Sequence, residues 1–508
     1  MSRLLFFPNL VFLVTLFFFP IAFLFSVGIH EFSNSIFQDA YLLYVLRFTY
    51  WQALISASLS VLLGMFFAFL IKEWRVFGGA VLWRFSLLCS SLPSIIVALG
   101  ILGSWGLQLN VFGWTGILLG NMFMNVAIPL RLIGTALTDR ERSSELTAQS
   151  LGLSKFGVFR KITWLAIRSS VFSSWILTFL YSSTSLFIVM FLGGGPRFTN
   201  LEVALYEAIK LNLDNSRAVQ ISLLQAGVGA VLFFFYLKLQ HRRKIQGEQL
   251  VFHTFFPKRA WVRGLGLGFL WCLAIAIFVF PLFSIISEGV PNLAFLEWDE
   301  LWVSFRTTLV ISTLVVFTSL FFLYPYLHVL HQSKTDEEAR KWMWLVGAPQ
   351  FFSPLVVCLA LSVCFPMVRD STSLSYLAII ATQVVFVIPV MHFPLREGFL
   401  RLAKERDWIA RSLGANPWQR FFFAELPFMR RSLFLSALMG FGFSMGEVVS
   451  VLLFSPPGIK TLSLNIFQAM SRYRFQEARA TTLVLLVAMF FVFSLVGFLE
   501  DKDESSSH

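Results

Sequence analysis

Two polar segments, ELTAQSLGLSKFGVFRKITWL (Glu145–Leu165) and DWIARSLGANPWQRFFFAELP (Asp407–Pro427), interrupt an otherwise apolar chain and begin 262 residues apart. Each segment is short and basic and holds a central Ser-Leu-Gly. Each stands between apolar runs long enough to cross a membrane. A polar segment that recurs in this setting indicates an internal repeat, with a polar loop at the same place in each copy.

Composition places the chain in a membrane. It has 508 residues, of which 57% are hydrophobic and 13% charged, and its mean hydropathy is +0.74. Soluble domains carry about 25% charged residues and lack repeated apolar runs of about 20 residues. The alternating pattern of a membrane β-barrel is absent. The sequence therefore predicts an all-α polytopic membrane protein.

About twelve transmembrane helices are expected, in two sets of six, because twelve apolar runs reach the length that spans the hydrocarbon layer. The runs of the first set are 5–27, 53–72, 84–105, 112–136, 171–193 and 218–239. The runs of the second set are 264–288, 308–330, 344–366, 375–395, 432–454 and 481–499.

The net charge of +12 is distributed over the short loops between these runs. A nucleic-acid-binding protein would concentrate such charge on one soluble domain, so no nucleic acid partner is expected. With the N-terminus inside, the inside segments hold 30 of the 40 Lys and Arg residues, as the positive-inside rule requires. Both termini and both Ser-Leu-Gly segments are then predicted to be cytoplasmic.

Pairs of residues recur at a nearly constant offset along the chain. Pro93 and Pro354 are 261 residues apart, and Gly152 and Gly414 are 262 residues apart. Six spans are an even number, so both copies enter the membrane from the same side and form two parallel six-helix repeats, with a substrate path expected between them. The predicted organisation is a first repeat over 1–245, a cytoplasmic linker over 246–262 and a second repeat over 263–508.

The residues of the two polar segments suit close approach by a partner protein. Gly152 and Gly414 can end a helix in the left-handed conformation. Glu145 and Asp407 lie where an acidic residue in the first turn favours the helix dipole. One such loop could be an ordinary basic loop, but its duplication at the same place in each repeat favours a docking role.

The segments resemble the cytoplasmic loop of the permease subunits of bacterial type I ABC importers, which follows the pattern E-A-A-x3-G-x9-I-x-L-P. The first copy has Leu146-Thr147-Ala148, Gly152, Ile162 and Trp164-Leu165 at that spacing. The second has Trp408-Ile409-Ala410, Gly414, Ala424 and Leu426-Pro427. The acid precedes the pattern by one residue in both copies, and it is Asp in the second, so the glycines and the duplication carry the resemblance more than the acids do.

The resemblance implies a coupling helix that fits a groove of a cytoplasmic ABC ATPase dimer, a periplasmic solute-binding protein on the other side, and a bacterial inner-membrane location. The chain has no G-x-x-x-x-G-K-[ST] phosphate-binding loop, so ATP is expected to be used by the partner and no cofactor by this chain. It is therefore expected not to be an enzyme, and no metal site is predicted. The expected ATPase-coupling residues are Glu145, Ala148, Gly152, Ile162, Asp407, Ala410, Gly414 and Pro427.

The resemblance extends to fused twelve-span permeases for thiamine and for iron(III). The tracts Leu192–Ile209 and Leu462–Leu486 are more similar to the thiamine type, so thiamine or its phosphates is the predicted substrate and iron(III) the alternative. An ion-coupled secondary transporter is the second alternative. It would require charged residues paired within the membrane and would leave the duplicated loops unexplained.

Four residues are candidates for the translocation path. An ionisable residue within a span is costly, so Glu447 could attract a cation or help to close a gate, or it could be hydrogen-bonded within the bundle as a structural residue. Ser444 near it, and Ser183 and Asn125 in spans of the first repeat, could line a path or join helices by hydrogen bonds. The candidates are Glu447, Ser444, Ser183 and Asn125.

The outside tracts 197–217 and 458–480 are predicted to be short amphipathic helices. Their duplicated position suits docking of the external binding protein. Helices that rest on lipid headgroups are an equal alternative.

Overall fold

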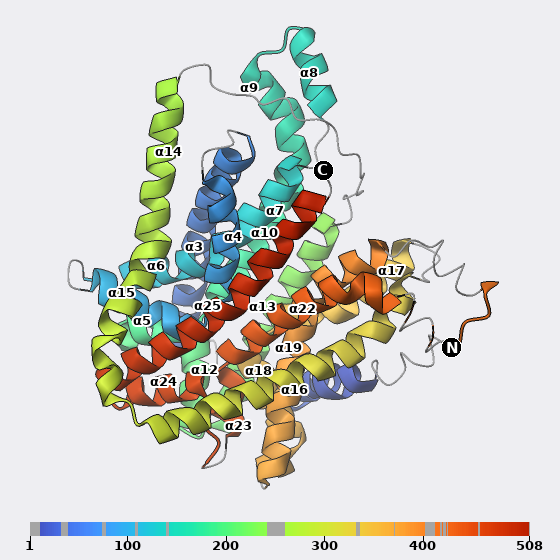
Figure 1. Ribbon diagram of the computed structural model, residues 1–508. Coiled ribbons are helices and arrows are strands. Elements are labelled where there is room, and N and C mark those ends of the chain that lie inside the picture. The colour runs from blue at the N-terminus through green and yellow to red at the C-terminus, as the bar shows by residue number, and fades with distance from the viewer. Residues whose placement is uncertain are drawn as a thin grey trace. The chain divides into compact units, whose positions relative to one another are not determined.

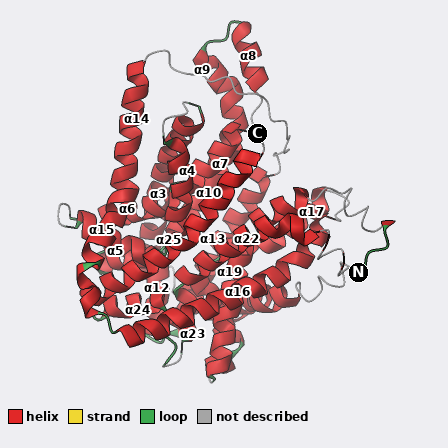
Figure 2. Ribbon diagram, in the orientation of Figure 1, coloured by secondary structure: helices red, strands yellow, loops and turns green. Residues whose placement is uncertain are grey.

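The computed structural model describes residues 11–31, 39–73, 78–106, 110–138, 142–240, 260–331, 336–369, 371–401, 412–416, 419, 423, 425–455 and 458–506. Over these residues the chain is helical and contains no strand (Figure 2). The predicted all-α fold is confirmed. The chain divides into two compact units, one made of residues 33–291 and the other of residues 1–32 and 292–508. We call them unit 2 and unit 1, respectively.

The compact units exchange the first span of each repeat. Unit 1 contains the span at 11–31 together with the last five spans of the second repeat, and unit 2 contains the span at 260–289 together with the last five spans of the first. Within unit 2 this exchanged span packs through α15 on α5, and within unit 1 α2 packs on α18. The predicted repeats are divided at residues 245 and 263, whereas the compact units are divided near residues 32 and 291. The repeat boundaries therefore stay a prediction from the sequence.

Unit 2 is drawn in Figure 1 with α8 and α9 at one end and α12 at the other. Its helices are α3 (Ala40–Lys72), α4 (Gly79–Ser91), α5 (Ser94–Trp105), α6 (Trp114–Asn125), α7 (Ala127–Thr138), α8 (Arg142–Ser150), α9 (Lys155–Val158), the π-helical turn η3 (Phe159–Thr163), α10 (Trp164–Ser183), α11 (Leu186–Leu192), η4 (Pro196–Phe198), α12 (Leu201–Lys210), α13 (Asn215–Gln240), α14 (Ala260–Ala274), η5 (Ile275–Val279) and α15 (Phe280–Gly289).

Unit 1 combines the N-terminal helices with the helices that follow η6 (Pro291–Phe295). The 3-10 helix η6 crosses the boundary between the units in the sequence. Its helices are η1 (Val14–Phe18), α2 (Phe19–Glu31), α16 (Trp298–His331), α17 (Asp336–Gly347), η7 (Ala348–Phe351), α18 (Pro354–Cys364), η8 (Pro366–Arg369), α19 (Thr372–Arg401), α22 (Leu426–Gly446), α23 (Val449–Phe454), α24 (Leu462–Ser471) and α25 (Phe475–Ser506).

Eight helices of the described chain are long and apolar enough to cross a membrane, and each overlaps one of the twelve predicted spans; the helix Lys155–Ser183 covers only the first part of the predicted span 171–193. Of the other four predicted spans, three are interrupted and the first is described only from residue 11. The run 5–27 corresponds to a helix at 11–27, and the run 84–105 is broken at Pro93 between α4 and α5. The run 344–366 is a helix pair bent by 95°, and the run 432–454 is divided between α22 and α23. Prolines explain two of the breaks, since the residue before a proline avoids the helical region.

Equivalent hydrogen bonds in the two units support the internal repeat. The buried hydroxyl of Thr49 accepts the backbone N–H of Leu201 at 2.8 Å, and the buried hydroxyl of Thr308 accepts that of Leu462 at 3.0 Å. In each unit, this bond joins the beginning of span 2 to the short helix that precedes span 6. A repeat that reproduces a buried side-chain contact, and not only a sequence pattern, has retained its local packing.

Candidate functional site

The first Ser-Leu-Gly segment forms helix α8 and a tight turn. The turn is closed by two backbone hydrogen bonds, from Gly152 N–H to the Gln149 carbonyl at 2.9 Å and from Leu153 N–H to the Ala148 carbonyl at 3.1 Å. Gly152 has φ +87°, as predicted for a glycine that ends a helix. A Cβ added there would meet no atom within 4 Å, so the turn leaves open space above the glycine.

Glu145 is buried, with 4% of its surface exposed, and its carboxylate accepts a hydrogen bond of 2.5 Å from the hydroxyl of Thr163. Thr163 ends the π-helical turn that leads directly into α10. The sequence predicted that Glu145 would favour the helix dipole and belong to the ATPase-coupling segment, and its burial leaves little of it on the surface. The structure adds a buried contact that ties α8 to the base of span 5.

The outer side of this segment is apolar and exposed. Leu151 is 76% exposed at the turn, and Leu146 and Phe156 are also exposed. Of the other two predicted coupling residues here, Ala148 and Ile162 are both half-buried. The exposed leucines and phenylalanine therefore form the surface available to a partner, while Ala148 and Ile162 contribute to packing beneath it.

The second segment repeats the turn where it is described. Gly414 has φ +73° and open space at its Cβ position, and the preceding Leu413 is 81% exposed. Pro427 is exposed in the first turn of α22. Asp407 and Ala410 lie outside the described residues.

Glu425 was not predicted to have a role. Only 2% of its surface is exposed, and its carboxylate accepts a hydrogen bond of 2.5 Å from the Tyr324 hydroxyl and lies 3.2 Å from Nε2 of His328. It follows Asp407 by 18 positions, as Thr163 follows Glu145. The base of span 5 thus carries a buried hydrogen-bonding residue at the same place in both repeats, although the chemical groups differ.

The predicted path residue Glu447 caps a broken span. Its carboxylate accepts the backbone N–H groups of Val449 at 2.8 Å and Ser450 at 3.1 Å, at the beginning of α23. Gln383 of α19 donates to the same carboxylate at 3.3 Å and accepts from the hydroxyl of Ser444 at 2.6 Å. The structure therefore joins Glu447 and Ser444 through one glutamine and gives Glu447 a capping role.

The first-repeat candidates belong to a similar polar cluster in unit 2. Asn125 donates to the Ser182 hydroxyl at 3.1 Å, while Gln52 donates to the Ser182 carbonyl at 2.7 Å and accepts from Asn121 at 3.0 Å. Ser183 donates to a carbonyl of its own helix at 2.7 Å. Span 5 is interrupted here at Thr184 and Ser185, as it is at Glu447 and Val448 in unit 1. Sequence reasoning missed Gln52 and Gln383, which hydrogen-bond to polar groups of neighbouring helices. The one available sign was the presence of an amide side chain within an apolar span.

The outside tracts contain the predicted helices, α12 and α24, but their position differs from the prediction. Both helices are largely buried, including Glu202, which receives a hydrogen bond from Gln225. The exposed part is the turn after each helix. Leu213 (φ 53°, 76% exposed) and Tyr473 (φ 60°, 81% exposed) lie at the tips of these turns.

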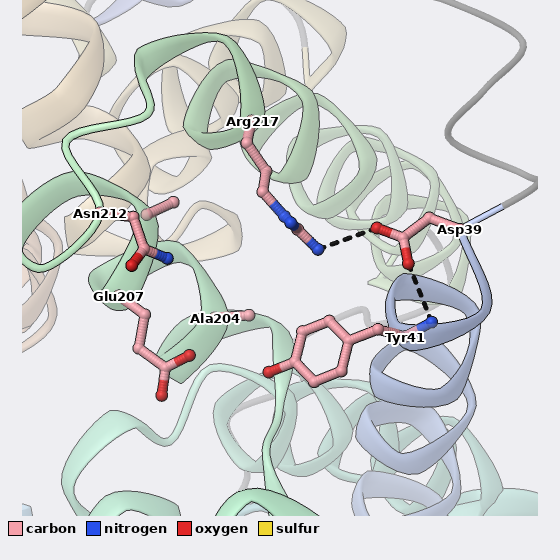
Figure 3. A pocket seen from close by; sticks show the side chains of 7 residues that line it. Asp39, Tyr41, Ala204, Glu207, Asn212 and Arg217 are labelled. Atoms are coloured by element: carbon pink, nitrogen blue, oxygen red, sulfur yellow. Dashed lines mark hydrogen bonds and ion pairs between the residues drawn. The ribbon is translucent and has the colours of Figure 1, made fainter.

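A pocket of about 330 Å³ lies beside the first of these turns, between the start of α3, the second half of α12 and the start of α13 (Figure 3). Arg217 forms an ion pair of 2.8 Å with Asp39, which also caps α3. Burial raises the pKa of the Glu207 carboxyl, and Arg217 opposes that rise. The pocket therefore offers a carboxyl group, an ion pair and the side chain of Asn212 beside the exposed turn.

No model of a known protein family matches the sequence. The chain is 27% identical over 501 residues to the thiamine transport system permease protein ThiP of Escherichia coli (strain K12), which covers 92% of this chain and 91% of that protein. It is 24% identical over 503 residues to the protein of the same name from Haemophilus influenzae, covering 92% and 91%. It is 23% identical over 457 residues to the Fe(3+)-transport system permease protein FbpB 2 of Haemophilus influenzae, covering 85% and 84%.

Proposed function

We propose that this chain is the transmembrane permease subunit of an ATP-binding-cassette importer for thiamine or its phosphates. The similarity to thiamine permeases over about nine tenths of both chains supports the assignment, and the iron(III) permease is less similar. In this proposal the chain is a multi-pass inner-membrane protein with both termini in the cytoplasm. A separate ATPase dimer uses the ATP, and this chain carries out no covalent chemistry.

The observation that carries the proposal is the form of α8. An exposed apolar end, closed at Gly152, suits insertion into a groove of another protein. The buried Thr163–Glu145 bond makes α8 a rigid extension of span 5, so a displacement of α8 would be transmitted to α10. The second segment has the same exposed leucine and left-handed glycine.

ATP-driven closure of the two ATPase subunits would then move both segments and alternate the access of the path between the two membrane faces. The interruptions of span 5 at Ser185 and Glu447 support such a path, because non-helical backbone at membrane depth is tolerated where it lines a cavity or is buried in protein. The binding energy for the substrate would differ between the two states.

The exposed tips at Leu213 and Tyr473 are proposed to contact a periplasmic binding protein. Both are non-glycine residues in the left-handed region, which costs about 1–2 kcal/mol each. Both are large, exposed side chains, and they follow the equivalent helices α12 and α24 of the two repeats. Strain retained at an exposed apolar tip is typical of a recognition site.

Transport by the reconstituted complex tests the substrate. Proteoliposomes that contain this chain with its partner ATPase and binding protein should accumulate labelled thiamine when ATP is supplied inside, and should not accumulate ferric ion. Accumulation of ferric ion alone would establish the iron(III) alternative. Uptake that follows an ion gradient without ATP would establish the secondary transporter.

The coupling role is tested by substitution of both turn glycines. Gly152→Leu with Gly414→Leu places bulk in the open space of each turn and should abolish ATP-driven uptake. Gly152→Asn with Gly414→Asn is the control, since Asn tolerates the left-handed region, and it should retain more activity. If the leucine variant transports normally at normal expression, the coupling assignment is wrong.

A further inference from the structure

A second pocket, of about 480 Å³, lies in unit 2 on the first half of α3. Its floor is aromatic. The ring of Phe48 lies 5.2 Å from that of Trp114 and 5.8 Å from that of Phe198, measured between centroids. Tyr44 donates a hydrogen bond of 2.5 Å to the Arg197 carbonyl, which fixes η4 against α3. The pocket is thus held by contacts between three segments rather than by one helix.

Two guanidinium groups stand at this aromatic floor. Arg47 and Arg197 both line the pocket and both are exposed. Arg197 lies over the ring of Phe198 at 5.7 Å. Within the described residues, neither arginine forms an ion pair with a carboxylate. The pocket therefore presents two cations without an anion, which is the opposite of the neighbouring pocket with its Asp39–Arg217 pair.

The pocket continues into an apolar stripe along α3. Tyr44, Trp51, Leu54 and Leu62 are all exposed, and their spacing puts them on the same side of the helix as Arg47. Trp and Tyr above an apolar stripe are typical of the level at which a span leaves the hydrocarbon layer. Arginine at such a position keeps its charge at the interface while its stem lies along apolar surface. The charge and the stripe together fit a ligand with an anionic head and apolar tails.

We propose that this pocket binds an anionic phospholipid of the outer leaflet. Its phosphate lies between the Arg47 and Arg197 guanidinium groups, which match phosphate oxygens geometrically. Its acyl chains lie along Trp51, Leu54 and Leu62. The proposal depends on the membrane placement of α3 and not on the transported substrate.

Lipid binding to the purified full-length chain tests the proposal. The chain in detergent is titrated with short-chain phosphatidylglycerol, and the bound lipid is counted by native mass spectrometry. We expect one tightly bound phosphatidylglycerol that phosphatidylcholine does not replace. Arg47→Gln with Arg197→Gln should weaken its binding about thirtyfold, since each basic residue near a lipid headgroup contributes a factor of about five. The control Arg217→Gln removes a charge from the same end of unit 2 and should leave the affinity unchanged.

Three results would overturn the proposal. One is unchanged phosphatidylglycerol affinity in the double variant, and another is equal binding of phosphatidylcholine. The third is displacement of the lipid by micromolar pyrophosphate, which would assign the pocket to a soluble phosphate compound. If the double variant does not fold, the single variants Arg47→Gln and Arg197→Gln give the same comparison at about fivefold each.

Discussion

Thr163 donates a hydrogen bond of 2.5 Å to the carboxylate of Glu145, 18 residues earlier in the chain, and both side chains are buried. This bond links the end of a π-helical turn to the first turn of α8. A helix of nine residues is too short to be stable in water by itself. The buried bond therefore contributes to the order of α8 as well as to its position.

Thr163→Val should loosen α8 without changing the surface that it exposes. The loss of a hydrogen bond to a charged group costs about 1.5–3 kcal/mol. Amide hydrogen exchange over Leu146–Gly152 should accelerate about tenfold or more, and ATPase-driven uptake should fall. Thr147→Val is the control, because the Thr147 hydroxyl bonds only to the Ser143 carbonyl on the exposed side of α8. Equal exchange rates in the two variants would show that the buried bond does not order the helix.

Glu447→Ala should destabilise unit 1, because it removes the acceptor for two backbone N–H groups at the start of α23. An N-terminal cap contributes about 0.5–2 kcal/mol. We expect a lower unfolding temperature in detergent and less uptake at saturation, with an unchanged KM for thiamine. Glu447→Gln retains one acceptor oxygen and should be intermediate in stability. A large rise in KM in a Glu447→Gln protein of normal stability would instead indicate direct contact with the cationic substrate.

The sequence predicted the helical class, the positions of most spans and the duplication, because these follow from run length and from recurring Pro and Gly. The interruptions at Ser185 and Glu447 could not be predicted, since both lie within continuous apolar runs. Hydropathy averages over a window, so it does not register that Gln52 from another helix satisfies the Ser182 carbonyl, or that Glu447 accepts the backbone N–H groups of Val449 and Ser450.

The short helices α12 and α24 show a related limit. In α12 the mixture of Leu, Val and Glu predicts an amphipathic surface helix, yet Glu202 is buried and bonded to Gln225 from α13. A polar residue in a periodic pattern indicates the solvent side of a helix only when the interior offers no hydrogen-bonding partner for it. The partner comes from a separate helix, so sequence periodicity carries no information about it. The sequence also does not predict that each first span packs in the other compact unit, because periodicity does not show which helix a span packs against.

Glu207→Gln should change how stability depends on pH. Burial raises the pKa of this carboxyl in the folded state, so its contribution is fully present below the unfolded pKa of about 4.3 and is lost as pH rises through the folded value. Glutamine resembles the protonated form. The variant should therefore unfold at a temperature at least equal to that of the wild type at pH 7, with the difference disappearing near pH 4. Asp39→Asn should lower the unfolding temperature at pH 7, because it breaks the ion pair with Arg217 while the Asn side chain can still cap α3.

Thr49→Val and Thr308→Val test whether the two repeats preserve the same packing energetics. Each substitution keeps the side-chain shape and removes the acceptor for one buried backbone N–H, that of Leu201 or Leu462. An unsatisfied buried donor costs about 1–3 kcal/mol. We expect similar decreases in unfolding temperature for the two variants, measured in the same detergent, and local exchange confined to the beginning of α12 or of α24. Thr307→Val, in which the lost hydroxyl bonds to a carbonyl of its own helix, is the control and should have a small effect. If only one of the two substitutions lowers the unfolding temperature, the repeats share this hydrogen-bond geometry but not its contribution to stability.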